Sequence, residues 1–250
     1  MREDIGIIER KTLNAWPALQ QMTYGGWLLR QSRGYTKRSN SVQPLWTDPG
    51  ADLRAMVGYC EDAYHRAGLP TIFKITPLCE SAGLDGRLDD YGYRLADRSL
   101  VLVRSLDAQV DVCSTDDLCV DGDLTEEWLA TASRLLQLRP EQTAIAAAML
   151  ASSSLRRGFF TLRSEGIPVA VGIGVIDDGD LGLYDIVTSL QHRNRGFGER
   201  LMRHILRWGQ SHGAHGSYLQ VIESNAAARR LYDKLGYRKL YEYWYRVRWP

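Results

Sequence analysis

The stretch Arg193-Asn194-Arg195-Gly196-Phe197-Gly198 lies between a predicted strand and a predicted helix. Its two glycines let backbone N–H groups approach an anion closely, and the start of a helix adds unpaired donors and a partial positive charge. These features suit a pyrophosphate. A dinucleotide fingerprint needs a third glycine where Leu201 stands, and no Walker lysine follows the loop. Because a lone G-x-G at a helix start is often a simple turn, the surrounding sequence has to decide.

The residues on both sides of this loop show strand and helix periodicity. Short β-rich runs separated by turn residues predict an antiparallel meander before the loop, and apolar residues recur at helical spacing after it. From residue 108 onward the predicted order is β–α–α–β–β–β–α–β–α–β. The clearest predicted strands are 157–164, 167–176, 181–189, 217–222 and 240–249, and the predicted helices are 124–138, 141–152, 198–213 and 225–235.

The two halves of the chain resemble each other. Residues 88–104 read LDDYGYRLADRSLVLVR and residues 232–248 read YDKLGYRKLYEYWYRVR, with a Gly-Tyr-Arg triplet aligned without gaps. Three further elements align in the same order, which predicts a tandem repeat with a first half at 1–107 and a second at 108–250. The aligned segments are 40–45 with 185–190, 53–67 with the helix after Gly198, and 71–76 with 217–222.

With the loop included, the second half resembles the GCN5-related N-acetyltransferase (GNAT) superfamily. The family's pyrophosphate loop, Q/R-x-x-G-x-G/A, is matched by Arg193, Gly196 and Gly198. In the first half the corresponding residues 48–52 read Asp-Pro-Gly-Ala-Asp, with no G-x-G and two acids that would repel phosphate. The family's downstream signature, N-x-x-A-x-x-hydrophobic-Y-x-x-x-G-F/Y, is matched by Asn225, Ala228, Leu231, Tyr232, Gly236 and Tyr237.

The resemblance implies an α/β fold: a mixed central sheet flanked by helices, in two tandem copies, the first shortened and without cofactor. It also implies that acetyl-CoA binds where the fourth and fifth strands of the second copy splay apart, often at a bulge in the fourth. Main-chain groups of Ile186, Val187 and Thr188 would pair with the pantetheine and polarise the thioester carbonyl, and Asn225 would touch the CoA arm. The loop residues that would hold the pyrophosphate are Arg193, Asn194, Arg195, Gly196, Phe197, Gly198 and Glu199.

The resemblance places Tyr232 beside the sulfur of the cofactor. A tyrosine is neutral at pH 7 and can donate a proton to the leaving thiolate, although Tyr232 alone would equally fit a core aromatic with a satisfied hydroxyl. Asp185 on the fourth strand and Glu223 after the fifth are available as a general base. Strand alternation leaves open whether Asp185 faces the substrate, and a surface carboxylate fits both residues equally well.

Polar residues interrupt a predicted strand of the first half where a buried strand would be apolar. Among them, Arg38 and Asn40 are the candidates for contact with an acceptor between the halves. The aromatic residues at 241–249 indicate packing of an edge strand or contact with a second copy in a homodimer, rather than a ligand cage.

Composition excludes several classes of partner. Lys and Arg total 31 against 30 for Asp and Glu, a net charge of +1, which argues against nucleic acid. The longest apolar run, at about 169–176, is far shorter than the roughly 18 residues of a membrane span. The four cysteines form no C-x-x-C motif and lack histidines at finger-like spacing, so we expect reduced thiols in a cytoplasmic protein and no metal.

We therefore expect an acetyl-CoA-dependent N-acetyltransferase that acetylates a primary amine of a small molecule by direct attack, without an acyl-enzyme. One alternative is an enzyme that acetylates a protein N-terminus or an aminoglycoside-like amine. The alternative from another class is a non-catalytic sensor that binds acyl-CoA.

Overall fold

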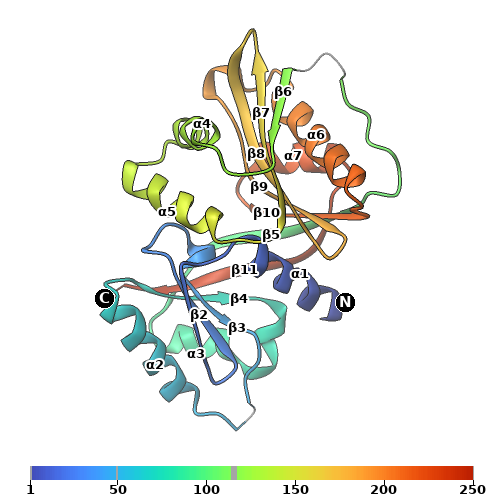
Figure 1. Ribbon diagram of the computed structural model, residues 1–250. Helices are drawn as coiled ribbons and strands as arrows, with labels where there is room; N and C mark the ends of the chain where they lie inside the picture. Colours follow the sequence, from blue (N-terminus) through green and yellow to red (C-terminus); the bar gives the residue numbers. More distant parts are fainter. Residues whose placement is uncertain (1, 49, 114–116, 250) are drawn as a thin grey trace.

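The computed structural model describes residues 2–48, 50–113 and 117–249. Within these residues, eleven strands form one mixed sheet in the order β1-β2-β3-β4-β11-β5-β10-β9-β8-β7-β6, with helices on both faces (Figure 1). The elements up to residue 105 are α1 (Arg2–Ala15), β1 (Gln20–Tyr24), β2 (Trp27–Gln31), β3 (Val42–Pro44), α2 (Leu53–Arg66), β4 (Thr71–Ile75), α3 (Leu84–Asp90) and β5 (Arg94–Ser105). Those from residue 117 are β6 (Asp117–Asp121), α4 (Glu126–Leu136), α5 (Pro140–Ala151), β7 (Arg156–Ser164), β8 (Ile167–Asp177), β9 (Asp180–Thr188), α6 (Phe197–Ser211), β10 (Gly216–Ile222), α7 (Ala226–Lys234) and β11 (Arg238–Arg248). Short 3₁₀ turns lie at Lys37–Ser39, Pro77–Ala82 and Leu190–His192.

The order of helices and strands occurs twice along the chain. The series α–β–β–β–α–β–α–β runs from α1 to β5 and again from α5 to β11, while β6 and α4 precede only the second series in the described residues. The predicted α/β class with a mixed, helix-flanked sheet is confirmed, as is the order of elements predicted for the second half. The division into domains at residues 107 and 108 stays a prediction.

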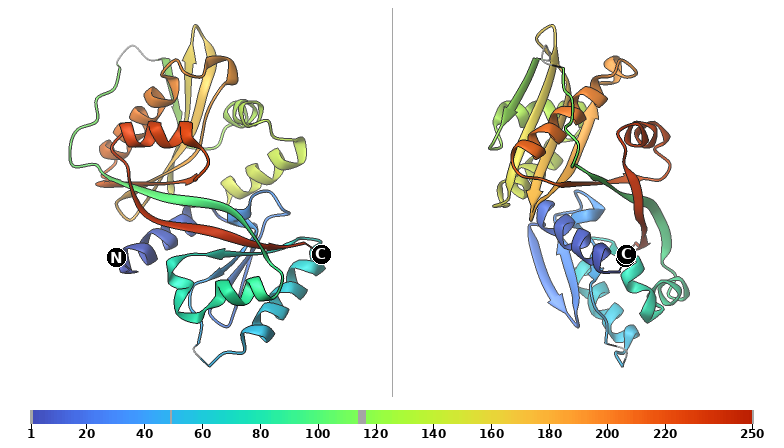
Figure 2. Two further views of the ribbon diagram at one scale, coloured as in Figure 1. Left: turned by 180° about the vertical axis from the view of Figure 1, so that it is seen from behind. Right: turned by 90° about the vertical axis from the view of Figure 1, so that its right-hand side faces the viewer.

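The last strand of each series pairs with a strand of the other series. β5 lies between β11 and β10, and β11 lies between β4 and β5, so the final strands are exchanged in the centre of the sheet (Figure 2). The expectation that the aromatic strand forms an edge is therefore wrong. Tyr241, Tyr243 and Tyr245 alternate along β11 and are all buried, because strands cover both of its sides and the core covers this face.

The two halves also share one hydrophobic core. Ile5 and Trp16 of the first half belong to the same buried cluster as Trp128, Phe159 and Tyr218 of the second. Burial of this common apolar surface fixes the position of the halves relative to each other.

Helix α6 lies close against the sheet. Its buried face is formed by Leu201, Met202, Ile205 and Leu206 at the predicted helical spacing. A Cβ atom at Gly209 would lie only 2.6 Å from Leu181 Cδ2, so this glycine permits the close approach. The packing fixes the N-terminus of α6 beside the end of β9.

None of the helices in the described ranges is long and apolar enough to cross a membrane. Over the same ranges, His, Cys, Asp and Glu side chains form no group of three or more that could hold a metal ion.

Candidate active site

The parallel strands β9 and β10 separate partway along their length. Their pairing runs from Asp180–Gly216 to Leu183–Leu219 and then ends. On the other side of β9, the register against β8 shifts between Val171 and Ile173, which is a β-bulge at Asp185 and Ile186. Asp185 has φ = +47°, a left-handed conformation uncommon for a residue with a side chain. The bulge and the strand separation occur on the strands where the family resemblance implies them.

A cleft of about 630 Å³ opens where the strands separate. Residues of both halves line it. The second half contributes residues of β9, β10, α7 and β11, and the first half contributes the loop before β3 together with β5. Among the predicted site residues, the cleft is lined by Asp185, Ile186, Asn225, Tyr232 and Arg38.

The loop before α6 presents backbone donors that no side chain caps. Asn194 (φ = +59°) and Gly196 (φ = +81°) adopt left-handed conformations on either side of Arg195, an alternation that gathers N–H groups into an anion-binding concavity. Gly196 is the N-cap residue of α6 and supplies no capping side chain. In α2, the corresponding helix of the first half, the Asp52 carboxylate accepts hydrogen bonds from two of these amides, Arg54 N and Ala55 N. The amides at the start of α6 are thus without a side-chain cap, whereas those of α2 are capped by a carboxylate.

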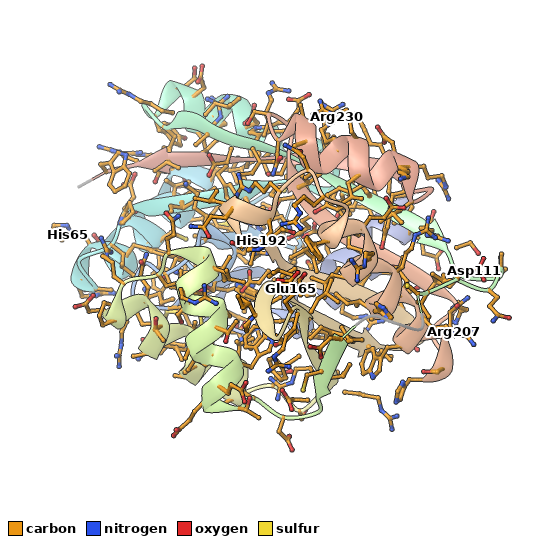
Figure 3. The ribbon with its side chains drawn as sticks, turned by 90° about the horizontal axis from the view of Figure 1, so that it is seen from above. His65, Asp111, Glu165, His192, Arg207 and Arg230 are labelled. Atoms are coloured by element: carbon orange, nitrogen blue, oxygen red, sulfur yellow. The ribbon has the colours of Figure 1, made fainter. Side chains whose placement is uncertain are left out.

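The side chains of the loop divide into two groups. Arg193 and Arg195 are exposed, whereas Phe197 is buried and anchors the start of the helix. A Cβ at Gly198 would lie 3.2 Å from Thr188 Oγ1, so this glycine lets the loop approach β9. In Figure 3, His192 marks the loop, which is seen between Arg230 of α7 and Glu165 of the β7–β8 turn.

The Glu199 carboxylate does not face the open amides. It accepts hydrogen bonds from Arg203 (3.0 Å) and Lys234 (2.6 Å), and these cations lower its pKa. Glu199 therefore ties α6 to α7, and only its backbone N–H is left for an anion.

Successive backbone N–H groups of a strand such as β9 point alternately to the two neighbouring strands. Ser189 N donates to Val169 O, and hydrogen-bonded pairs alternate along an antiparallel ladder. Val187 is consequently the next residue whose N–H points to β8, which directs the Thr188 N–H to the side where β10 has separated. Of the three main-chain candidates, Ile186 lines the cleft at the bulge, whereas Val187 is turned to β8.

Helix α7 carries the two residues of the downstream signature. The Asn225 side chain caps the helix by accepting from Ala228 N (3.1 Å), and it also lines the cleft. Tyr232 is 8% exposed and lines the same cleft, and burial raises its pKa to about 12. The phenol thus stays protonated at neutral pH, as a proton donor must.

Asp185 points into the cleft beside a cation from the first half. Its carboxylate lies 3.8 Å from Arg38 Nη2, and burial raises its pKa against the opposing effect of that guanidinium. A carboxyl with a raised pKa is a better proton acceptor than an exposed aspartate.

Asn40 does not line the cleft. Its Oδ1 accepts from Ser32 N (2.7 Å) and Gly34 N (2.8 Å), and its Nδ2 donates to Thr36 O (2.8 Å). The predicted strand is instead a loop with a 3₁₀ turn at Lys37–Ser39, because these local bonds satisfy the backbone without a neighbouring strand. Asn40 thus positions the loop and does not contact an acceptor.

Gln220, Tyr243 and Tyr245 are among the cleft residues that were not predicted as site residues. Gln220 interrupts the apolar strand β10, and this polar residue within an otherwise apolar run is a signal that sequence reasoning can use. Tyr243 and Tyr245 reach the cleft only because β11 is exchanged into the centre of the sheet.

Comparison with known proteins identifies relatives over the whole length. A family model described as "Probable histone acetyltransferase Rv0428c C-terminal" matches residues 3–246. The chain is 31% identical over 249 residues to "Uncharacterized N-acetyltransferase YobR" of Bacillus subtilis (strain 168), covering 98% of this chain and 99% of that protein.

Solved structures share the fold at lower identity. A GCN5-related N-acetyltransferase from Kribbella flavida superposes with a TM-score of 0.71 at 18% identity, covering 97% of this chain and 94% of that one. A tandem GNAT protein from the clavulanic acid biosynthesis pathway gives a TM-score of 0.64 at 15% identity, covering 83% and 74%. The matching sequences and fold show that this chain belongs to the GCN5-related N-acetyltransferase family and is an N-acetyltransferase of that type.

Proposed function

We propose that the protein transfers the acetyl group of acetyl-CoA to a primary amine of a small molecule by direct attack. The observation that carries the proposal is the uncapped, glycine-bearing N-terminus of α6 next to the cleft formed by the separated strands. Its open amides suit the pyrophosphate, and Asn225 at the cleft suits the pantetheine arm.

Acetyl-CoA supplies an acetyl thioester, whose C–S bond breaks as the new C–N bond forms. Ile186 lines the cleft, and its backbone N–H would stabilise the carbonyl oxygen as negative charge develops on it. Asp185 would accept the proton that the attacking amine loses, and Tyr232 would donate its proton to the departing sulfur. Both groups line one cleft, so no covalent intermediate on the protein is required.

The cleft favours a small acceptor. Its volume of about 630 Å³ is in the range of small-molecule pockets, and the first half closes one side of it. Two cations, Lys37 and Arg38, and two anions, Asp97 and Asp185, line it, so the charge is balanced. A polycationic acceptor such as a basic protein segment or an aminoglycoside would favour an acidic cleft instead.

The test measures release of free thiol from acetyl-CoA with a panel of primary amines. Wild type should turn over at least one amine, and Tyr232→Phe should bind acetyl-CoA with unchanged affinity by calorimetry but lose about 10²-fold or more in kcat. Tyr59→Phe is the matched control, because this tyrosine stacks on Tyr24 in the first half, away from the cleft. Binding of acetyl-CoA without turnover of any amine would favour a sensor, and no binding would refute the acetyl-CoA site.

We also propose a cytoplasmic location. Cys60, Cys79 and Cys119 are free thiols, and Cys60 and Cys79 are buried within the core of the first half. Unpaired thiols are typical of a reducing compartment. A homodimer, inferred from the aromatic residues near the C-terminus, stays a prediction.

A further inference from the structure

Arg38 presents an unused guanidinium edge to the cleft. Its Cζ stacks 4.5 Å from the centroid of the Trp16 ring and 5.8 Å from that of Tyr184. In the part of the chain that the structure describes, the only carboxylate close to it is Asp185 at 3.8 Å, beyond hydrogen-bond distance. The guanidinium is therefore held by aromatic rings while its donors remain available.

Hydrogen bonds from neighbouring residues hold the backbone that carries Arg38. Arg30, which is almost completely buried, donates from Nη1 to Arg38 O at 2.8 Å. Trp16 Nε1 donates to Thr36 Oγ1 at 3.2 Å, and Asn40 fastens the preceding turn. A cation held in place before a ligand arrives loses little conformational freedom on binding.

Asp185 offers unused acceptor capacity next to this cation. Its side chain is 14% exposed and sits on the bulge, and it makes no hydrogen bond with other described residues. Gln220 also lines the cleft, and its buried Oε1 accepts no hydrogen bond from the residues that the structure describes. Buried polar atoms without partners are uncommon in native proteins and indicate that another molecule satisfies them.

We infer that the acceptor is a free α-amino acid, whose carboxylate binds Arg38 and whose amine binds between Asp185 and Gln220. The inference rests on the proposed acetyl transfer and names its substrate class. In an α-amino acid the amine nitrogen and the carboxylate oxygens are roughly 3 Å apart, because one carbon separates the two groups. A cation and an anion 3.8 Å apart, each with free hydrogen-bonding capacity, match that spacing.

Other amines leave one of these groups unsatisfied. The first residue of a protein carries an amide where the amino acid has its carboxylate, and a lysine side chain carries no carboxylate near its amine. A polyamine would place additional positive charge beside Arg38. The other cation of the loop, Lys37, already donates to Asp97 at 2.6 Å, so it does not compete for the carboxylate.

The experiment compares each of the twenty L-amino acids with its carboxamide as acceptor. Wild type should acetylate at least one free amino acid with a kcat/KM about 10- to 100-fold above that of its amide, the range expected for a charge-assisted contact. Arg38→Gln should remove this preference by lowering kcat/KM about 10- to 100-fold more for the acid than for the amide; because the guanidinium also acts on Asp185, a smaller change common to both acceptors is expected. Arg38→Lys, which keeps the charge but loses the planar fork, should retain part of the preference.

Arg33→Gln is the control with the same loss of charge, since Arg33 is exposed on the same segment and does not line the cleft. Equal activity on acids and amides, or an equal effect of Arg38→Gln on both, would overturn the inference while leaving acetyl transfer intact. If acetyl-CoA binds but no amine is acetylated, a thermal-shift measurement with the same amino acids in the presence of CoA tests whether an amino acid binds in the cleft. A rise in Tm that Arg38→Gln abolishes supports the site, and no rise with any amino acid overturns it. Failure to bind acetyl-CoA by calorimetry refutes the proposed function instead.

Discussion

A buried ion pair fastens the exchanged strand β11 to the first half, and its removal should destabilise the protein strongly. Lys74 Nζ on β4 lies 2.6 Å from Glu9 Oε2 on α1, and both side chains are 4% exposed. Tyr241 of β11 donates to the other Glu9 oxygen, and Lys74 Nζ lies 4.4 Å from the centroid of the Tyr243 ring. The pair therefore joins three elements beneath the cleft.

Lys74→Met would leave the Glu9 carboxylate buried with one neutral donor. Breaking such a pair from one side costs about 3–5 kcal/mol, because a buried charge loses its partner. For a chain of this size 1 kcal/mol shifts Tm by about 2–4 °C, so we expect Tm to fall by roughly 6–20 °C. The double variant Glu9→Gln/Lys74→Met removes both charges and keeps an acceptor for Tyr241, so it should recover at least about 2 kcal/mol relative to Lys74→Met.

Equilibrium unfolding in urea and thermal unfolding measure these differences. Lys239→Met is the control: Lys239 pairs with Glu242 at 3.1 Å on the surface, and the loss should stay below about 1 kcal/mol. A loss below 1 kcal/mol for Lys74→Met, or a double variant less stable than both single variants, would refute the reasoning.

Three further changes test the site and its scaffold. Gly196→Asp should weaken acetyl-CoA binding, measured by calorimetry, at least about 10-fold, because the new carboxylate would cap α6 as Asp52 caps α2. Gly166→Asp in the β7–β8 turn is the control and should leave the affinity unchanged, since Gly166 also has a positive φ and open space around it. Because the pKa of Asp185 is raised, we expect kcat to fall with decreasing pH already above the ordinary aspartate pKa of about 4. Asp185→Asn should lower kcat about 10²-fold or more and abolish this acid limb of the pH–rate profile. A pH–rate profile that is unchanged in the variant would contradict the role of Asp185 as the base. Hydrogen bonds from Arg246 and Trp244 lower the pKa of Asp85, so its contribution to stability is present above about pH 4 and is lost as the pH falls through the lowered value. Asp85→Asn should then flatten the acid limb of Tm against pH, and the exposed Asp62→Asn should leave it unchanged.

Much of the second half was predictable because its signals are local. The loop before α6 and the predicted helix at 225–235 each depend on a few consecutive residues whose conformations follow from their own side chains. The matching spacing of loop and signature was enough to predict the family and the α/β class.

The orientation of Asp185 was not predictable from strand alternation. The bulge breaks the period of two at that residue, and it arises from pairing between β8 and β9 that no short stretch of sequence reports. The assignment of Asn40 to an acceptor failed for a related reason. Its polarity signals a need for hydrogen bonds, but not whether backbone or ligand satisfies them.

By itself, the sequence determined the repeated order of elements, the anion-binding loop and its loss in the first half, because helix and strand periods, glycines and capping residues act over short distances. Only the tertiary structure decided that β5 and β11 change places. Both strands carry aromatic or aliphatic side chains in alternation, and their backbones can form hydrogen bonds with the neighbouring strand of either half. Burial of the core common to both halves selects the exchanged arrangement. That choice brings Tyr243 and Tyr245 to the cleft, and the common core holds Arg38 beside Asp185, so residues of both halves line the cleft.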